Sequence, residues 1–436
     1  MRRFGAEQGG TAVAVSLLGF GGVGQEIYRQ IVSSERELLA MCRCPVFVHR
    51  ILVKDDVEAS SARTAVADPA SVTTDFEETL KASILVEAIG GVEPAYSYVM
   101  TGIERGCSIV TVNKDLMGVY GPAILRAALE RKVVVDYEAT VGGAVPVLGP
   151  IREHLAPAGI YQVTGVFSGT CNNLLTQMKD RLLSLREGLD ASKKAGATEP
   201  DPRRDTSGRD SAAKIALTLT EAFGFWFEPS EVATEGVEGV SLVDMAFALE
   251  ARHCIKLIGL ARRLHGSQFW AAVFPAMVPA DSLLGRVEGH DGAVVVSGEG
   301  FGRVVLQGTA AGPRAVAAKV IAGIARIARR AGCEPDYRVP SGTAALTRTE
   351  PTMPHYARLR GDALPSPRLA DLVLSEFAGR RLTPTWHRSE TSDGGVDLAV
   401  FLPPCTRDEL HGVLQALKSV HGISTCAIYR VIDDSV

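Results

Sequence analysis

Up to Thr140 the chain alternates between short apolar runs and longer segments with helical periodicity. The apolar runs have the length of buried strands and cover Val13–Leu18, Val46–Val53, Ile84–Ile89, Ser108–Val112 and Val133–Tyr137. Helical segments are expected between them at Gln25–Ser33, Pro94–Arg105 and Gly121–Arg131. Strands that alternate with helices form right-handed βαβ units, so the pattern predicts a parallel sheet in an α/β domain over residues 1–145.

After Thr140 the elements no longer alternate regularly. The expected elements are a strand at Val163–Phe167, helices at Leu174–Ala195 and Asp210–Phe223, a segment Ser241–Leu264 that is helical at first and strand-like at Ile255–Leu260, and strands at Val294–Val296 and Val304–Gln307. This mixture predicts a second, α+β domain over residues 146–308. An Ala-rich helix at Ala315–Arg330 is expected to complete the first domain, so that residues 309–334 belong with 1–145.

Residues 335–354 carry Pro, Ser, Thr and Gly and are typical of a linker. The segment after them, 355–436, has the order strand, helix, strand, strand, helix, strand. Its expected elements are Tyr356–Arg360, Arg368–Phe377, Leu382–Arg388, Val396–Leu402, Arg407–Val420 and Ser424–Val431. This order predicts a C-terminal ferredoxin-like βαββαβ domain.

Composition narrows the classes of function. The chain has 436 residues, of which 46% are hydrophobic and 22% charged, with a net charge of -4. That length suits two or three globular domains, and the small net charge argues against a nucleic-acid binder. The apolar run Thr11–Leu18 is too short for a signal peptide or a membrane span. Because the eight cysteines show neither a CxxC pair nor zinc-finger spacing, we expect reduced thiols in a cytoplasmic protein.

A glycine turn, Gly19-Phe20-Gly21-Gly22-Val23-Gly24, follows the first expected strand and opens a helix. This is the context of a dinucleotide-binding fingerprint, in which free N–H groups at a helix N-terminus attract a pyrophosphate and glycines allow its close approach. Lys54, Asp55 and Asp56 follow the second strand. A base there suits the 2′-phosphate of NADP and an acid suits the ribose of NAD, so both cofactors stay open, as does an exposed charged turn.

Two further pairs of polar residues are candidates for chemistry. Asn113 and Lys114 end the fourth expected strand, where ligands bind in doubly wound sheets, although a surface turn would explain them equally well. Asp210 and Lys214 are four residues apart and therefore share one face of a helix. They form either an ordinary exposed ion pair or a lysine that a carboxylate holds for proton exchange with a substrate hydroxyl.

Seven segments of residues 11–332 resemble, in order, the homoserine dehydrogenase family. They are LLGFGGVGQ, VEAIGGVEPA, IVTVNKDLMG, YEATVGGAVP, FSGTCNNLL, TEPDPRRDTSGRDSAAK and GVSLVDMAFALEARHCIKLIGLA. The hinge segment YEATVGGAVP and the catalytic segment TEPDPRRDTSGRDSAAK are specific to this family rather than to Rossmann enzymes at large. The resemblance implies a Rossmann-like nucleotide-binding domain, a substrate and dimerisation domain, and NAD(P)-dependent interconversion of L-aspartate 4-semialdehyde and L-homoserine. That reaction belongs to threonine, methionine and isoleucine biosynthesis.

The resemblance also implies roles for individual residues. The catalytic residues would be Lys214, Asp210 and Lys114, and the substrate-binding residues Glu199, Asp205 and Lys114. The cofactor, NADP or NAD, would contact Gly19, Gly21, Gly22, Val23, Gly24, Lys54, Gly90, Lys114 and Gly312. Glu138, Val141, Gly143 and Val145 match a site for a monovalent cation, Na+ or K+, built largely from backbone carbonyls. A tight turn at the domain hinge would explain the same four residues.

Two segments depart from the family pattern. Gly308–Pro313 keeps only part of a later glycine-rich loop. The C-terminal domain resembles an amino-acid-binding ACT domain in its order of elements, but Leu364–Pro367 replaces the usual Asp-Arg-Pro-Gly start. The resemblance implies a homodimer or homotetramer without an aspartate kinase domain, and L-threonine as an allosteric inhibitor. Two alternatives stay open: a reductase of another amino-aldehyde, and a catalytically silent nucleotide-binding sensor.

Overall fold

The computed structural model describes residues 12–194, 203–264, 266, 268–330, 339–362, 364–392 and 395–432. It divides into two compact units. Unit 1 contains Met1–Gly159, Ala216–Pro229 and Gly308–Ala344, and unit 2 contains Ile160–Ile215, Ser230–Gln307 and Ala345–Val436. The chain passes between the units within helix α10 (Arg209–Phe223), so the two units do not coincide with the domain boundaries expected from the sequence.

Unit 1 is built on a parallel sheet. Its strands are β1 (Val13–Leu18), β2 (Val46–Leu52), β3 (Val72–Thr73), β4 (Ile84–Glu87), β5 (Ser108–Thr111) and β6 (Val135–Asp136). They lie in the order β3-β2-β1-β4-β5-β6, and every neighbouring pair is parallel. This is the strand order of a Rossmann fold, in which ligands bind outside the carboxyl ends of the strands. The predicted Rossmann-like domain is therefore confirmed.

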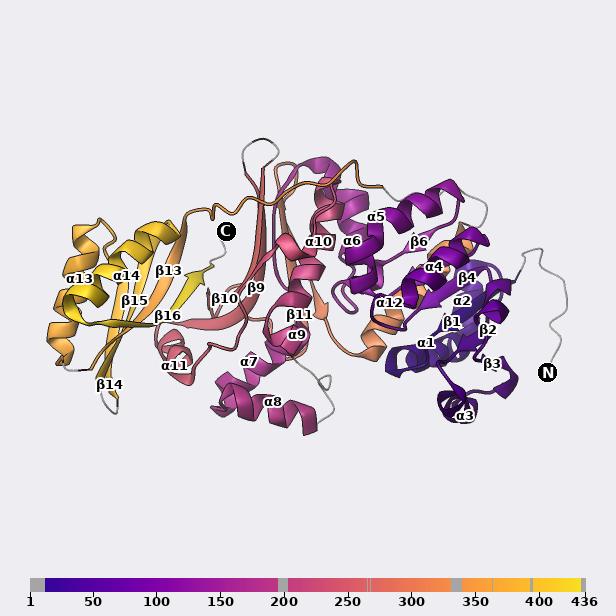
Figure 1. Cartoon of the computed structure of the whole chain (residues 1–436), viewed down its shortest axis with the longest axis horizontal. Coiled ribbons are helices and arrows are strands. Elements are labelled where there is room, and N and C mark those ends of the chain that lie inside the picture. Colours follow the sequence, from indigo (N-terminus) through magenta and orange to yellow (C-terminus); the bar gives the residue numbers. More distant parts are fainter. Residues whose placement is uncertain are drawn as a thin grey trace. The chain divides into compact units, whose positions relative to one another are not determined.

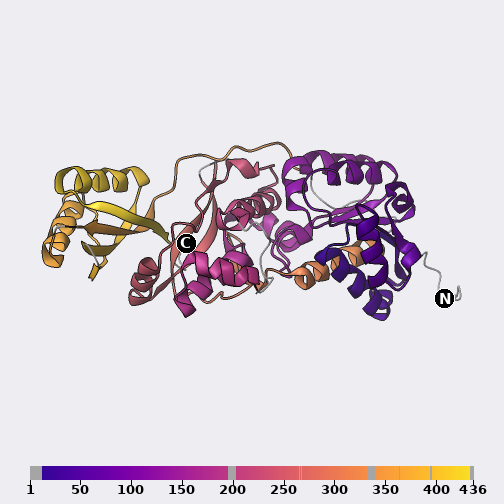
Figure 2. The same ribbon diagram turned by 60° about the horizontal axis from the view of Figure 1, so that its bottom comes forward.

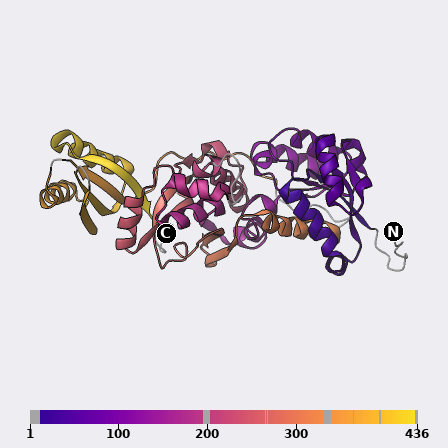
Figure 3. The same cartoon turned by 90° about the horizontal axis from the view of Figure 1, so that it is seen from below.

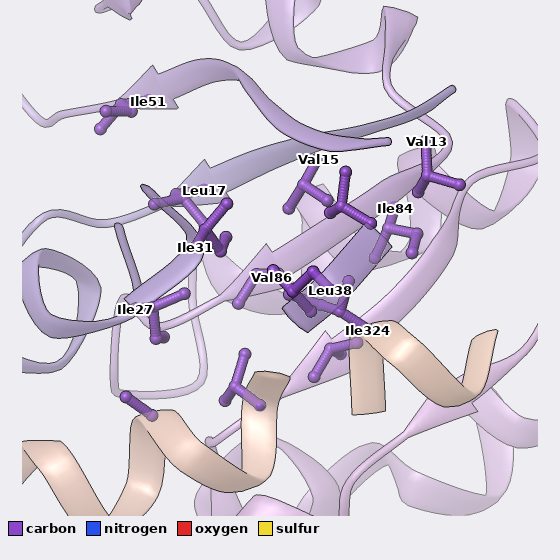
Figure 4. Close-up of a cluster of buried hydrophobic side chains, with 14 of the residues drawn as sticks. Val13, Val15, Leu17, Ile27, Ile31, Leu38, Ile51, Ile84, Val86 and Ile324 are labelled. Carbon is purple, nitrogen blue, oxygen red and sulfur yellow. The ribbon is translucent and has the colours of Figure 1, made fainter. Parts of the chain in front are cut away.

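The helices of unit 1 include one from a distant part of the sequence. The described helices are α1 (Gly22–Ser33), α2 (Glu35–Cys42), α3 (Asp56–Ala65), α4 (Ala95–Glu104), α5 (Lys114–Glu130), α6 (Leu148–Pro150), the second half of α10 and α12 (Pro313–Arg329). Helix α12 packs beside α1 and α2 (Figures 1 and 3). Its Ile324 is fully buried in the same cluster as Val15, Leu17 and Ile27 (Figure 4). The helix expected at 315–330 thus completes the core of the Rossmann sheet.

Unit 2 contains a large mixed sheet. Its strands are β7 (Ile160–Val166), β8 (Ala233–Thr234), β9 (His253–Arg263), β10 (Phe269–Pro279), β11 (Asp291–Gly298), β12 (Gly302–Thr309), β13 (Met353–Gly361), β14 (Trp386–Ser392), β15 (Gly395–Cys405) and β16 (Ser424–Val431). The order is β12-β11-β7-β9-β10-β16-β13-β15-β14, with β8 beside β10. Strand β10 is buried along almost its whole length, although the sequence analysis does not predict it. Two prolines, Pro275 and Pro279, obscure it, since proline is rare inside a sheet.

The helices of unit 2 are α7 (Gly169–Arg181), α8 (Leu185–Lys194), α9 (Arg203–Thr206), α11 (Leu242–Glu250) and the first half of α10. The single helix expected at 174–195 is interrupted at Leu182. The backbone of this residue is left-handed, with φ of 55°, and a left-handed residue ends an α-helix. The interruption therefore separates α7 from α8.

The last six elements of unit 2 follow the predicted order. They are β13, α13 (Ser366–Gly379), β14, β15, α14 (Arg407–His421) and β16. Within the sheet these strands have the order β16-β13-β15-β14, and each neighbouring pair is antiparallel. Helices α13 and α14 pack on them around a shared core (Figures 1 and 2). Strand β16 also pairs with β10, at Ala276 and Met277. One sheet thus runs through segments that the sequence analysis assigns to two domains.

The described part of the expected linker, residues 339–354, forms hydrogen bonds first with unit 1 and then with unit 2. The Gly342 carbonyl accepts a 2.7 Å hydrogen bond from the Trp226 N–H in unit 1, and the Thr347 N–H donates one of 2.8 Å to Phe269 in unit 2. No helix among the described residues is long and apolar enough to cross a membrane. The cysteines that the structure describes are free thiols, as the sequence predicts.

Candidate active site

Two glycines shape the turn between β1 and α1. Gly19 has φ of +99°, and a Cβ there would lie 2.7 Å from the main-chain oxygen of Ala88 on the neighbouring strand connection. A Cβ at Gly24 would lie 2.3 Å from the Gly19 oxygen. Both distances are too short for any side chain. The turn therefore depends on glycine at these two predicted positions, which brings α1 close to the end of β1.

The other predicted residues of this turn leave room for a ligand. Gly21 precedes the first turn of α1, and a Cβ there would meet nothing within 4 Å. At Gly22 the nearest neighbour of such a Cβ is Pro313, at 3.7 Å, so Gly312 and the start of α12 lie beside the turn. Val23 packs on the hydrophobic core and holds α1 in place. The N-terminus of α1 can therefore receive a pyrophosphate close to its backbone N–H groups.

The residues after β2 have separate roles. The Asp55 carboxylate caps α3 by accepting hydrogen bonds from the N–H groups of Val57 and Glu58, at 3.1 and 2.9 Å. Lys54 is exposed, and its own N–H donates to the Glu58 carboxylate. Asp55 thus acts as the cap of α3, and the contact of Lys54 with the adenosine ribose stays a prediction.

Sequence reasoning missed a buried carboxylate at the end of β4. Glu87 is fully buried and accepts hydrogen bonds from the Thr111 hydroxyl at 2.5 Å, the Ile89 N–H at 2.9 Å and the Asn113 side chain at 3.3 Å. Burial raises the pKa of Glu87, and the hydrogen bonds from Thr111, Ile89 and Asn113 lower it in part. A glutamate at the end of an apolar strand does not indicate this role in the sequence, because only the fold brings β5 beside Glu87.

Glu87 arranges the loops that carry Gly90 and Lys114. Gly90 and Gly91 have φ of +81° and +72°, and the Gly91 oxygen accepts a 2.6 Å hydrogen bond from the Asn113 side chain. Asn113 also caps α5, since its side chain accepts from the Leu116 N–H. Lys114 is therefore the first residue of a helix at the carboxyl end of β5, half-buried. The glycine turn, Gly90 and Lys114 thus lie at the same edge of the Rossmann sheet.

Unit 2 holds the predicted acid–base group. The Lys214 ammonium is 2.7 Å from the Asp210 carboxylate, one turn earlier on α10, and donates a 3.0 Å hydrogen bond to the Phe167 oxygen. The two side chains are only 14% and 11% exposed, so this is not the ordinary surface ion pair that the sequence left open. A buried pair with a second hydrogen bond is held far more rigidly than a surface pair.

A second acidic residue lies beside this pair. The Asp205 carboxylate accepts a 3.3 Å hydrogen bond from Ser168, which caps α7. The Asp205 oxygen of the main chain accepts one of 3.1 Å from the Cys171 thiol. Burial, and next the charge of Asp205, raises the pKa of Cys171, which keeps it a thiol and argues against a nucleophile. The predicted substrate residue Glu199 lies outside the described residues.

The segment expected to hold a monovalent cation is a tight turn in unit 1. Gly143 has φ of +57° and lies against Ala310, and the Ala144 N–H donates to the Thr309 oxygen at 2.9 Å. The buried Val145 donates its N–H to the Gly142 oxygen at 2.8 Å. No group of three or more His, Cys, Asp or Glu side chains suited to a metal occurs among the described residues. Any cation here would therefore depend on main-chain oxygens.

A lysine that the sequence analysis did not single out reaches these oxygens. Lys319 of α12 is 6% exposed, and its ammonium donates hydrogen bonds to the main-chain oxygens of Glu138, at 3.2 Å, and of Val141. It also lies 3.5 Å from the Glu138 carboxylate, which accepts from the N–H groups of Val147, Leu148 and Gly149. The residues present thus do not fit a metal cation, because an ammonium already bonds to two of the predicted ligands.

Comparison with known proteins agrees with this geometry. The family profile described as "Homoserine dehydrogenase, NAD binding domain" matches residues 19–138, and "Homoserine dehydrogenase" matches residues 146–325. A homoserine dehydrogenase of Pseudomonas aeruginosa is 31% identical, over 78% of this chain and 81% of its own length. One of Corynebacterium glutamicum is 33% identical, over 73% of each chain.

A solved structure agrees over almost the whole chain, including β13–β16. The homoserine dehydrogenase of Thiobacillus denitrificans has a TM-score of 0.86 and 27% identity, and the match covers 98% of this chain and 100% of that one. With its Rossmann sheet, its glycine turn and its buried lysine–carboxylate pair, the chain belongs to the homoserine dehydrogenase family.

Proposed function

We propose that this chain interconverts L-aspartate 4-semialdehyde and L-homoserine with NADP or NAD, and that Lys214 is the proton donor. The observation that carries the assignment of Lys214 is its buried ion pair with Asp210, close to Ser168 and Asp205. A flexible surface pair would contribute little to catalysis. The Lys214 ammonium is held by both Asp210 and the Phe167 oxygen, so it can be positioned to donate a proton to a bound substrate. The product places the enzyme in threonine, methionine and isoleucine biosynthesis.

The chain's own groups would supply alignment, charge and a proton. The nicotinamide, when bound, supplies the hydride. As the aldehyde carbon is reduced, its oxygen gains negative charge, which the Lys214 ammonium stabilises before transferring a proton to it. Asp210 holds the ammonium, and Asp205 and Glu199 would bind the amino acid part of the substrate. Lys114, at the N-terminus of α5, would contact both cofactor and substrate.

The direct test is to incubate the purified chain with homoserine and either NADP or NAD. The absorbance of the NADPH or NADH that forms measures the rate of oxidation. We expect activity with homoserine and none with other small amino alcohols of similar size. Activity that prefers a different amino alcohol would favour a reductase of another amino-aldehyde. No turnover with any substrate, although the cofactor binds, would favour a nucleotide-binding sensor.

We expect Lys54→Ala to distinguish the two cofactors. A lysine that pairs with the 2′-phosphate makes a charge-assisted contact, and its loss should raise the KM for NADP about tenfold or more. The KM for NAD, which lacks this phosphate, should change by no more than about a factor of two. Lys81→Ala, at another exposed lysine of unit 1, is the matched control. Equal losses with both cofactors would mean that Lys54 only closes the turn before α3.

The C-terminal elements would bind an effector. We propose that β13–β16 with α13 and α14 form an ACT-like unit over 355–436, joined to a substrate domain over 146–308, and that L-threonine inhibits the enzyme through it. The support is the ferredoxin-like strand order β16-β13-β15-β14. Threonine shifts the enzyme only if it binds two of its states unequally. A cytoplasmic homodimer or homotetramer stays a prediction.

The start of α13 is the place to test threonine inhibition. The Ser366 hydroxyl lies 2.5 Å from that of Ser389 and ties α13 to β14. We expect Ser366→Tyr to raise the threonine concentration for half inhibition about tenfold and to leave turnover without threonine unchanged. Ser375→Tyr, on the exposed side of the same helix, should behave as the original chain. A full-length enzyme that ignores threonine at millimolar concentration would leave this unit with a structural role or another ligand.

A further inference from the structure

One face of α12 lies on the segment that follows β6. Lys319, Gly323 and Arg326 are spaced by four and three residues and therefore share this face. Gly323 lies so close to Asp136 that an added Cβ would be 2.6 Å from its carboxylate, and Arg326 forms a 2.7 Å ion pair with the same carboxylate. These two contacts fix the rotation of α12. Lys319, one turn before Gly323, is thereby directed at the turn after Asp136.

The turn presents oxygens to the ammonium of Lys319. Gly142 and Gly143 have φ of +79° and +57°, and both positions are too crowded for a side chain. A Cβ at Gly142 would lie 3.6 Å from the Lys319 nitrogen, which shows how closely the ammonium approaches the turn. The hydrogen bonds to the oxygens of Glu138 and Val141 complete its placement. The positive charge therefore lies where the family resemblance places a metal cation.

We propose that the Lys319 ammonium replaces the monovalent cation, so that this enzyme requires neither Na+ nor K+. A main-chain oxygen attracts an ammonium and a metal cation by the same partial negative charge. Once the ammonium is bound, a second cation at these oxygens would be repelled strongly, because like charges a few ångströms apart interact with little screening inside a protein. Since the ammonium is attached to the chain, its local concentration is independent of the salt outside.

The lysine also balances a buried negative charge. The Glu138 carboxylate is already held by three N–H groups at the start of α6, and Lys319 brings a cation to within 3.5 Å of it. Removing a buried partner leaves the other charge uncompensated, which is strongly destabilising. A small cation from solution could then occupy the space. The same turn should thus become cation-dependent when Lys319 is removed.

The first experiment uses the unmodified chain. It is exchanged into tetramethylammonium chloride at an ionic strength of about 0.1 M, and K+ or Na+ is then substituted at constant ionic strength. We expect the same turnover and the same melting temperature in all three salts. The melting temperature reports cation binding without reference to the assigned reaction, since a ligand that binds only the folded state stabilises it. A failure of the proposed function would therefore leave this test intact.

The second experiment removes the ammonium. Lys319→Ala should lose about 10- to 100-fold in turnover in tetramethylammonium and recover much of it in K+, with a rise in melting temperature. The Met side chain of Lys319→Met fills the space without a charge, so the turnover that this variant loses should not be restored by K+. Arg326→Ala, on the same face of α12, removes a cation from Asp136 instead and should also show no response.

Two results would overturn the proposal. One is an unmodified chain that is activated or stabilised by K+ or Na+, or that binds Rb+ at the Glu138 and Val141 oxygens in an anomalous scattering map. The other is a folded Lys319→Ala chain whose turnover and melting temperature ignore every monovalent cation. If Lys319→Ala fails to fold, the salt response of the unmodified chain still decides the question.

Discussion

Lys214→Ala is expected to lower turnover by about 10²- to 10⁴-fold, because general acid–base catalysis contributes factors of this size. The substitution removes the ammonium that bonds to Asp210 and to the Phe167 oxygen. It leaves the Rossmann unit untouched, so the dissociation constant of NADP, measured by fluorescence titration, should change little. Lys114→Ala should also reduce turnover strongly, but with an additional rise in the KM of the cofactor, because Lys114 lies at the cofactor edge of unit 1.

Lys179→Ala is the matched control for Lys214. Lys179 lies on α7 of the same unit and forms ion pairs with Asp180 and Glu288, but it is one-third exposed and not part of the proposed site. Its loss should leave turnover close to that of the unmodified chain, since exposed pairs contribute little. Circular dichroism and melting curves would show that each variant is folded. Turnover of Lys214→Ala within tenfold of the unmodified chain would remove Lys214 as proton donor.

The Rossmann domain could be predicted from the sequence because its elements are determined mostly by residues that are close together in the chain. Each of its longer strands is an apolar run between helices, and the glycines at 19 and 24 are demanded by contacts within one strand–turn–helix unit. The same holds for Asp210 and Lys214, which are neighbours on one helix turn. The sequence could not show that their pair is buried, since burial depends on strands far away in the chain.

Residues whose role depends on distant partners escaped the sequence analysis. Glu87 acquires its role from Thr111, at the end of the neighbouring strand β5, and from Asn113, which caps α5. Lys319 acquires its role from the oxygens of Glu138 and Val141, far earlier in the chain. The pairing of β16 with β10 is equally nonlocal, so the continuous sheet of unit 2 had no signature in periodicity. The order of the elements along the chain could therefore be predicted from the sequence, whereas the contacts between distant elements could not.

One buried charge network secures this nonlocal part of unit 2. Asp244 of α11 is fully buried and forms a 2.8 Å ion pair with Arg358 of β13. It also accepts hydrogen bonds from the hydroxyls of Tyr356, at 3.1 Å, and Tyr429, at 3.3 Å. Burial, and next the nearby Asp244 charge, raises the pKa of both tyrosines, which remain neutral donors. Three side chains of the C-terminal strands thus converge on one carboxylate.

Asp244→Ala should therefore lower the free energy of unfolding of unit 2 by about 3–5 kcal/mol, the usual cost of removing one partner of a buried pair. Arg358 would keep its 3.0 Å contact with Asp397 and its 3.4 Å hydrogen bond to the Ser241 hydroxyl, and both tyrosine hydroxyls would lose an acceptor. The measurement is the urea midpoint, followed by near-ultraviolet circular dichroism. Glu250→Ala is the matched control, because Glu250 ends the same helix and pairs with Arg388 in the open, at 48% and 62% exposure, where a pair contributes about 0–1 kcal/mol. Equal midpoints for Asp244→Ala and Glu250→Ala would mean that packing of α11, rather than this carboxylate, holds the C-terminal strands to the sheet.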